Sequence, residues 1–340
     1  MKQPRVLVVD DSAFARTVLS RVLKASGSID VIGTARDGDD ALAQIAEKDP
    51  DLVTLDLTMP GTGGLDVLRA LQGKKRPRVL VVSVSTIDSA PGVEALALGA
   101  IDIVSKPTAL ASDRLYELGA ELVEKVIAAT AFHEVARVTP TPVAPALRGA
   151  AELVMIGTST GGPQALTRVL AALPANLEAA VAVVLHIPVG YTEALAKRLN
   201  DSSPLEVVEA SEGIELKRGR VVLAKAGHHL KLRRNGERLT AHLDVLPIRA
   251  HTPAVDELFL SGAETMGAKC LGVVLTGMGD DGLVGARAIA AAGGSLLTES
   301  AATSVVYGMP RVVFEAGLGA RQTSLDLIPS EITYYVPSRR

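Results

Sequence analysis

The sequence predicts two α/β domains, each built on a parallel sheet. The chain has 340 residues and a hydrophobic fraction of 48%, and short apolar runs alternate with helical patterns in both halves. At about 150 residues per domain, this length corresponds to two domains. The apolar fraction can build two cores, which excludes a chain that is disordered throughout.

The first half of the chain contains five short apolar runs separated by amphipathic stretches. The runs are rich in Val, Ile and Leu and do not alternate with polar residues, which is typical of parallel strands buried on both faces. Five such βα units predict a small doubly wound domain with a parallel sheet. The predicted strands are Val6–Val9, Val31–Thr34, Leu52–Leu55, Val79–Val82 and Ile101–Val104.

A long helix and a linker are expected in the middle of the chain. Residues 112–132 carry an apolar stripe from Leu115 to Ala129 at spacings of three and four. Residues 133–150 contain three prolines and little periodicity, which favours a semi-extended linker. We therefore expect domains over residues 1–125 and 151–340, joined by a linker over residues 126–150.

The βα alternation resumes at Glu152. Two stretches, Gln164–Leu173 and Leu283–Ala292, are expected to be helical, and Asn235-Gly236 predicts a hairpin turn within Lys231–Leu239. The second domain is therefore expected to be a Rossmann-like α/β domain with a mostly parallel sheet and a β-hairpin. Its predicted strands are Leu153–Ile156, Val181–Leu185, Val221–Leu223 and Leu271–Leu275.

Composition and charge exclude several classes of protein. The 35 basic and 38 acidic residues give a net charge of −3, so no basic excess favours nucleic acid as a partner. No apolar run is long enough for direct membrane insertion, and the N-terminus does not resemble a signal peptide. The single cysteine, Cys270, excludes an internal disulfide framework and favours a reducing cytoplasm.

A cluster of charged and polar residues is expected at one edge of the first sheet, because the carboxyl ends of strands in an open α/β sheet converge on one crevice. The residues at the predicted strand ends are Asp10, Asp11, Asp56, Ser83 and Lys106. Several carboxylates together suit Mg²⁺, and Asp56 would then be able to attack a phosphoryl group. Ser83 and Lys106 would contact the phosphoryl oxygens. The alternative is that the aspartates only cap the helices that follow.

This first segment resembles response-regulator receiver domains. The resemblance rests on the Asp10-Asp11 pair, the Asp56-Leu57-Thr58-Met59-Pro60 run and Ser105-Lys106-Pro107. It implies a flavodoxin-like fold, phosphorylation at Asp56 and a conformational switch through Ser83 and Lys106. It also implies Mg²⁺ bound by Asp10, Asp11, Asp56 and Thr58. One departure is Ile103, which stands where many receivers carry Tyr or Phe.

Three strand ends in the second domain carry Ser159, His186 and Asp281. Together these residues supply the nucleophile, the base and the orienting acid of a catalytic triad. Each also has a simpler interpretation. The glycine-rich loop around Ser159 is also typical of phosphate binding, a lone histidine is more often structural, and glycine-flanked aspartates often mark a turn.

These segments resemble the chemotaxis protein-glutamate methylesterase family. The matching stretches include Ile156–Gly162, His186-Ile187-Pro188 and Leu275–Gly282. The resemblance implies that Ser159, His186 and Asp281 are catalytic, that a backbone N–H such as that of Met278 binds the oxyanion, and that the esterase chemistry needs no cofactor. Thr158 stands where this family commonly has Ala.

The implied substrates are glutamate methyl esters and glutamines of methyl-accepting chemoreceptors, and the implied phosphodonor is a chemotaxis sensor histidine kinase. We expect the unphosphorylated receiver to cover the catalytic crevice and phosphorylation of Asp56 to loosen it. Two alternatives remain open. One is a phosphorylation-controlled module that binds an anion at Gly161-Gly162 without catalysis. The other is a nucleotide-binding enzyme, which lacks support because no acidic ribose-binding residue follows Gly162 at the expected spacing.

Overall fold

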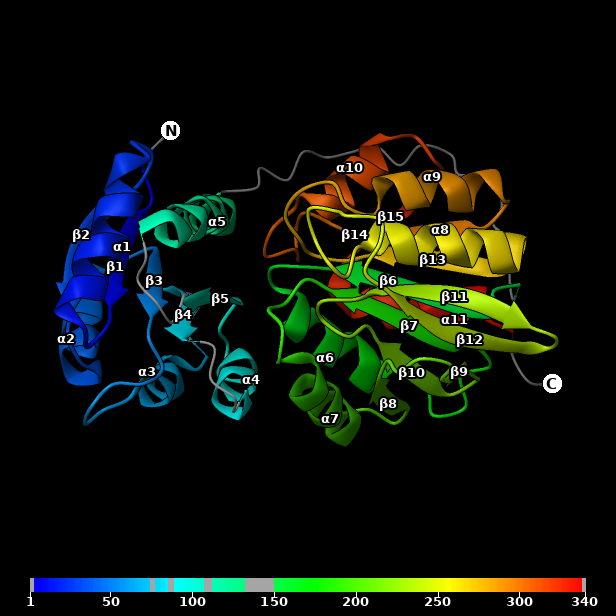
Figure 1. Cartoon of the computed structure of the whole chain (residues 1–340), viewed down its shortest axis with the longest axis horizontal. Coiled ribbons are helices and arrows are strands. Elements are labelled where there is room, and N and C mark those ends of the chain that lie inside the picture. The colour runs from blue at the N-terminus through cyan, green and yellow to red at the C-terminus, as the bar shows by residue number, and fades with distance from the viewer. Residues whose placement is uncertain (1–2, 74–76, 85–88, 107–111, 132–149, 338–340) are drawn as a thin grey trace. The chain divides into compact units, whose positions relative to one another are not determined.

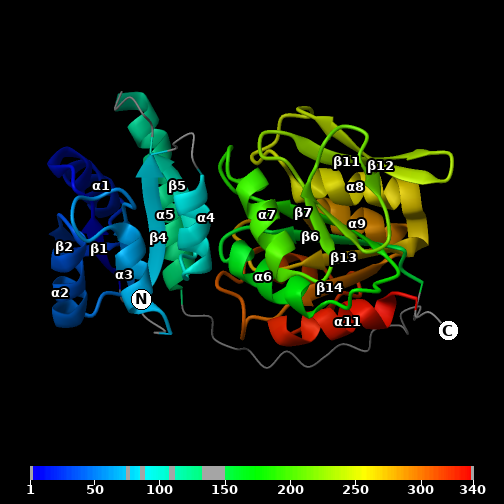
Figure 2. The same cartoon turned by 90° about the horizontal axis from the view of Figure 1, so that it is seen from below.

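The computed structural model of the chain is shown in Figure 1 and, turned by 90°, in Figure 2. The structure describes residues 3–73, 77–84, 89–106, 112–131 and 150–337. The chain divides into two compact units, Met1–Phe132 and His133–Arg340. Within the described part of the chain, no helix is both long and apolar enough to span a membrane.

The first unit is a five-stranded parallel sheet, as the sequence predicts, and its strand order is β2-β1-β3-β4-β5. Because β2 and β3 flank β1 on opposite sides, the direction of winding reverses at β1, and a crevice forms beside its carboxyl end. The strands are β1 (Arg5–Val9), β2 (Asp30–Ala35), β3 (Leu52–Leu55), β4 (Arg78–Val84) and β5 (Asp102–Lys106).

Helices cover both faces of this sheet. The helices are α1 (Ala13–Ala25), α2 (Gly38–Lys48), α3 (Gly64–Leu71), α4 (Ala90–Ala97) and α5 (Ser112–Thr130). Helices α1 and α5 pack against one another, and α3 packs against both α2 and α4. Helix α5 continues past the domain end that we expected at residue 125, because Val126 and Ala129 are fully buried. Most of the expected linker, residues 132–149, lies outside the described residues.

The second unit is built on a seven-stranded sheet with strand order β15-β14-β13-β6-β7-β10-β8, in which all neighbouring strands are parallel. The prediction of a mostly parallel sheet is therefore confirmed. Its strands are β6 (Leu153–Thr158), β7 (Ala180–Leu185), β8 (Glu206–Glu209), β10 (Arg220–Leu223), β13 (Cys270–Val274), β14 (Ser295–Glu299) and β15 (Arg321–Thr323).

The predicted hairpin is also present, in a separate antiparallel sheet. Strands β11 (His229–Asn235) and β12 (Arg238–Asp244) pair around a turn at Gly236 and Glu237, and β9 (Glu215–Leu216) pairs with β12. This three-stranded sheet packs on helix α8 (Val255–Met266) through β11.

Helices form a layer on each side of the parallel sheet (Figures 1 and 2). Helix α8 lies on one face with α9 (Leu283–Ala291) and α10 (Met309–Glu315), and short 3₁₀ turns occur at Gly267–Lys269 and Leu325–Leu327. The opposite face carries α6 (Gly162–Ala172), α7 (Thr192–Ser202) and α11 (Ile328–Tyr335).

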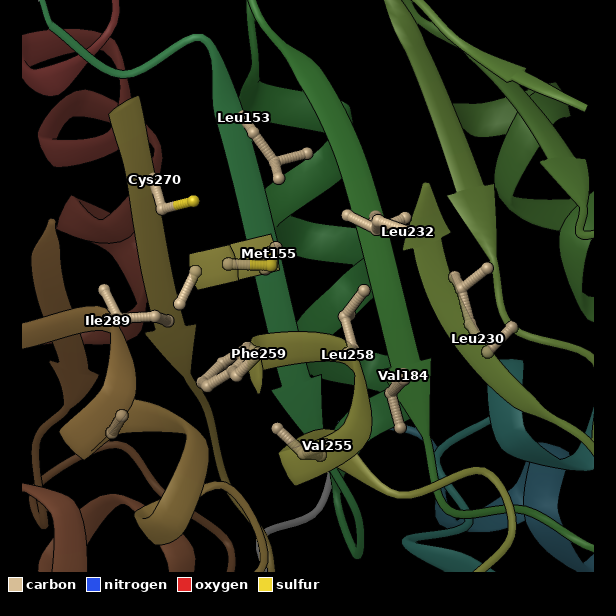
Figure 3. Packing of buried hydrophobic residues seen from close by; sticks show 14 of the residues in the cluster. Leu153, Met155, Val184, Leu230, Leu232, Val255, Leu258, Phe259, Cys270 and Ile289 are labelled. Atoms are coloured by element: carbon tan, nitrogen blue, oxygen red, sulfur yellow. The ribbon is translucent and has the colours of Figure 1, made fainter. Parts of the chain in front are cut away.

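Figure 3 shows how helix α8 is held in the main hydrophobic core of this unit. Val255, Leu258 and Phe259 project from the helix and are fully buried, among Met155 of β6 and Leu230 of β11. Burial of each such side chain stabilises the folded state by about 1.5–3 kcal/mol. The packing fixes the N-terminus of α8 at the edge of the sheet where the candidate site lies.

Candidate functional sites

The first unit has an acidic pocket at the carboxyl ends of β1 and β3. Oxygen atoms of Asp10, Asp11 and Asp56 lie within 4.8 Å of one another. Lys106 places its Nζ 2.5 Å from Asp10 Oδ2 and 2.6 Å from Asp56 Oδ2, and Ser83 donates a hydrogen bond to Asp56 Oδ1 at 3.1 Å. The structure therefore brings together all five residues that the sequence placed at strand ends.

This donor set suits a divalent cation. Carboxylates outnumber the ammonium group by two, and carboxylate oxygens are ligands that Mg²⁺ prefers. Burial raises the pKa of Asp10 above its ordinary value in spite of the opposing hydrogen bond and charge of Lys106. Burial therefore disfavours the ionised form of this carboxylate, and a bound cation would stabilise that form. The fourth predicted ligand residue, Thr58, lies beside the pocket, where its N–H donates to Asp56 Oδ1 at 3.3 Å.

The second site lies at the carboxyl edge of the larger sheet, where Ser159 and His186 follow adjacent strands. Thr158 of β6 pairs with Leu185 of β7, so the next residues of the two strands, Ser159 and His186, lie next to each other. The His186 N–H donates to the Thr158 carbonyl at 3.1 Å. On the other side, the Ser159 N–H donates to the Thr276 carbonyl at 3.0 Å. The Ser159 loop is therefore held between the strand ends of β7 and β13.

His186 and Asp281 form a buried hydrogen-bonded pair. His186 Nε2 lies 2.8 Å from Asp281 Oδ2, and the two side chains are only 7% and 14% exposed. An ionised carboxylate only accepts, so Nε2 carries the proton. The other ring nitrogen, Nδ1, is buried without a hydrogen-bond partner and is therefore available as a base. The adjacent Asp280 is exposed, so Asp281 is the member of the Asp280-Asp281 pair that meets the histidine.

The carboxylate of Asp281 is held at the start of helix α8. Its two oxygens accept hydrogen bonds from the N–H groups of Val255, at 2.7 Å, and Asp256, at 2.9 Å. Burial alone would raise the pKa of Asp281, but the hydrogen bond from His186 and those from these N–H groups outweigh burial and lower it. The site therefore keeps Asp281 ionised beside the imidazole.

Two further side chains at this site were not among the catalytic residues expected from the sequence. Asp256 Oδ1 accepts hydrogen bonds from the N–H groups of Gly282, at 3.0 Å, and Gly285, at 2.8 Å, which open helix α9. The ring of His251 stacks on that of His186, with centroids 4.1 Å apart and an angle of 22° between the planes. In the sequence, His251 lies shortly before helix α8 and Asp256 in its first turn, and neither position reveals these contacts.

Backbone packs closely against Ser159 at the segment that carries Met278. A Cβ atom on Gly277 would lie 3.1 Å from both the N and Cβ atoms of Ser159, so a side chain there would press on the serine. Gly161, at the start of α6, has a φ of 83°, which glycine adopts without strain. Met278 is half-buried and directly follows Gly277, so its backbone lies next to the segment that touches Ser159.

Comparison with known proteins identifies both units. The family described as CheB methylesterase matches residues 154–332, and the response regulator receiver domain matches residues 6–117. The chain is 57% identical over 332 residues to the Myxococcus xanthus protein-glutamate methylesterase/protein-glutamine glutaminase 5, with 95% of each chain covered. A Geobacter sulfurreducens relative, protein-glutamate methylesterase/protein-glutamine glutaminase 3, is 39% identical over 98% of this chain and 97% of its own.

A solved structure agrees with these matches. The crystal structure of the Thermotoga maritima CheB methylesterase catalytic domain aligns with a TM-score of 0.52 and 39% identity, and covers 54% of this chain and 97% of that one. With family matches in both halves and relatives that align over nearly the whole length, the chain belongs to the CheB methylesterase family and carries an N-terminal response regulator receiver domain.

Proposed function

We propose that this protein is a phosphorylation-regulated protein-glutamate methylesterase that also deamidates glutamines, and that its substrates are chemoreceptors. The observation that carries the proposal is the buried His186–Asp281 pair at the strand edge that also presents Ser159. The names of the relatives at 57% and 39% identity support the same activity.

In the proposed reaction, Ser159 Oγ attacks the carbonyl carbon of the glutamate methyl ester while His186 Nδ1 takes the hydroxyl proton. Asp281 stabilises the imidazolium that forms and fixes the orientation of the ring. The Met278 N–H is our candidate donor to the oxyanion of the tetrahedral intermediate. Collapse of this intermediate breaks the ester bond, and the histidine passes its proton to the departing methoxide, which leaves as methanol.

Water then completes the cycle. The oxygen of a water molecule attacks the acyl-enzyme while His186 takes a proton from that water. The proton then passes to Ser159 Oγ as the glutamate product leaves. A glutamine side chain reacts in the same way, with ammonia as the first product. Each step uses the same proton acceptor, because Asp281 occupies Nε2 and leaves Nδ1 free.

In the receiver, we propose Asp56 as the residue that accepts a phosphoryl group from a sensor histidine kinase. Asp10, Asp11, Asp56 and Thr58 would hold Mg²⁺, which when bound neutralises the charge of the incoming phosphate. Lys106 and Ser83 already contact the Asp56 carboxylate and would pair with the new phosphoryl oxygens.

Release of methanol from a methylated chemoreceptor, with and without a small-molecule phosphodonor, tests this proposal. We expect release by the purified chain, increased by the phosphodonor. Receptor binding without methanol release would instead favour a phosphorylation-controlled binding module.

A further inference from the structure

Thr276, two residues after the end of β13, forms hydrogen bonds with three consecutive residues, Thr158 to Thr160. Its carbonyl oxygen accepts hydrogen bonds from the Thr158 hydroxyl, at 2.7 Å, and the Ser159 N–H, at 3.0 Å. Its own hydroxyl donates to the Thr160 carbonyl at 2.9 Å. All four residues are buried, so these bonds are shielded from water. On the β13 side, the Ser159 loop is therefore held by a single residue that contacts three consecutive positions.

Thr276 is in turn held by Glu299, the last residue of β14. The Thr276 N–H donates to Glu299 Oε2 at 2.8 Å. Strand β14 pairs with β13 through Val274 and Thr298, which brings Glu299 alongside the chain that leads to Thr276. A continuous chain of hydrogen bonds thus runs from β14 through β13 to the residue that we propose as the nucleophile.

Glu299 is an unusual residue for this place. It is 0% exposed, and its second oxygen, Oε1, is buried without a hydrogen bond of good geometry. Burial raises the pKa of Glu299, against weaker contributions from the Thr276 N–H, the Thr303 hydroxyl and the charge of Arg168 that lower it. A neutral carboxylic acid still offers an acceptor oxygen to Thr276. The contact therefore depends on the reach of the side chain and not on a charge.

We propose that Glu299 is a positioning residue that fixes Thr276 and, through it, the loop that presents Ser159. This proposal rests on the proposed role of Ser159 as the nucleophile. Leu296 and Leu297 of the same strand are buried and apolar, whereas Glu299 carries a carboxyl group into the core. A polar group buried without partners is unfavourable, so Glu299 is best explained by the hydrogen bond that it accepts.

The test compares three variants of the full chain, activated with a phosphodonor and assayed on a methylated chemoreceptor fragment. Glu299→Gln keeps the acceptor oxygen, and its kcat should stay within about threefold of wild type. Glu299→Leu removes the acceptor, and its kcat should fall roughly 10–100-fold because the loop that presents Ser159 is misplaced. KM should change little, because the substitution leaves the enzyme's substrate-binding surface unchanged. Glu299→Asp is one methylene too short to reach Thr276 and should also lower kcat, by about tenfold.

Thr298→Val is the matched control. Thr298 is the preceding residue, is equally buried, and its hydroxyl has no hydrogen-bond partner, so its loss should leave kcat unchanged. Hydrogen exchange at the Ser159 amide, resolved by NMR, provides a second measurement that does not depend on turnover. Exchange should be faster in the Leu and Asp variants and unchanged in the Gln variant.

Two results would overturn the proposal. One is a folded Leu or Asp variant with wild-type kcat and wild-type exchange at Ser159. The other is a Gln variant as impaired as the Leu variant. If the Leu variant does not fold, the Asp variant decides alone. A Ser159→Ala enzyme that still turned over would refute the proposed nucleophile, whereas the exchange measurement would still decide whether Glu299 positions the loop.

Discussion

Asp256 and Asp281 lie at the starts of two different helices, and each accepts backbone hydrogen bonds from the start of the other residue's helix. Asp281, just before α9, binds the first N–H groups of α8, while Asp256, in the first turn of α8, binds the first N–H groups of α9. Carboxylates at helix N-termini are stabilised by unpaired N–H groups and by the helix dipole. These reciprocal hydrogen bonds fix the starts of α8 and α9 to one another. They also fix the Asp281 carboxylate, which contacts His186.

We expect Asp256→Ala to lower the free energy of unfolding by about 1–2 kcal/mol, because the N–H groups of Gly282 and Gly285 lose their acceptor. Asp256→Asn keeps an acceptor oxygen and should cost less. Denaturant unfolding measures both, with Asp201→Ala at an exposed helical position as the control. Equal stability of the Ala variant and the wild type would mean that water replaces the carboxylate without loss.

Asp281→Asn should reduce turnover by roughly 10⁴-fold, because an amide neither holds the required tautomer of His186 nor stabilises the imidazolium. The neighbouring Asp280 is exposed and makes a matched control, and Asp280→Asn should have a mild effect. Steady-state methanol release from methylated receptor gives both values. A large loss in Asp280→Asn with little in Asp281→Asn would reverse the assignment.

Ser159→Ala should abolish turnover, with a loss on the order of 10⁴–10⁶ in kcat if the three residues act as a unit. The folded state should survive, because the backbone hydrogen bonds of Ser159 to Thr276 and Gly162 do not involve its hydroxyl. Circular dichroism and thermal unfolding check the fold. Turnover near that of wild type would remove Ser159 from the mechanism.

A residue's place in the fold is predictable from the sequence where it follows from the residue's own segment. Asp10, Asp56 and Lys106 each follow or end an apolar run that forms a strand, and parallel strands must end at a common edge. Ser159 and His186 likewise follow apolar runs that form neighbouring parallel strands. These residues are predictable because local pattern and sheet topology together fix their location.

Other features depend on contacts between distant segments and leave little local signal. Strands β8 and β15 were not predicted, because they are short edge strands: β8 has only two apolar residues, both between glutamates, and β15 has none. Asp256 looks like an ordinary first-turn acid, and only the tertiary structure reveals that it binds α9. Glu299 ends an apolar run, and its partner Thr276 is 23 residues away, so no spacing rule links them.

Cys270 allows a test of the core beneath the site. Burial raises the pKa of its thiol to about 12 from an ordinary value near 9. The folded protein thus holds the proton over a pH range in which the unfolded chain releases it, so stability should fall as the pH rises from about 9 toward 12. Urea unfolding at pH 8 and pH 10 should show an extra loss of about 1 kcal/mol in wild type relative to Cys270→Ala. The same loss in both proteins would contradict this assignment.

We expect regulation by the receiver to depend on Asp56. Asp56→Asn should abolish activation by phosphodonor and Mg²⁺ while basal methanol release continues, because the amide is a poor nucleophile toward phosphorus. Asp30→Asn, at an exposed position in β2, is the control and should be activated normally.

If the receiver inhibits by covering the catalytic site, a fragment starting at Ala150 should be more active than the unphosphorylated full chain. Such a fragment should fold, because the main core of the second unit is drawn from residues of that unit alone. A well-folded fragment that is no faster than the full chain would rule out simple occlusion. Activation would then require a favourable contact made by the phosphorylated receiver, and deleting that domain would abolish stimulation without raising the basal rate.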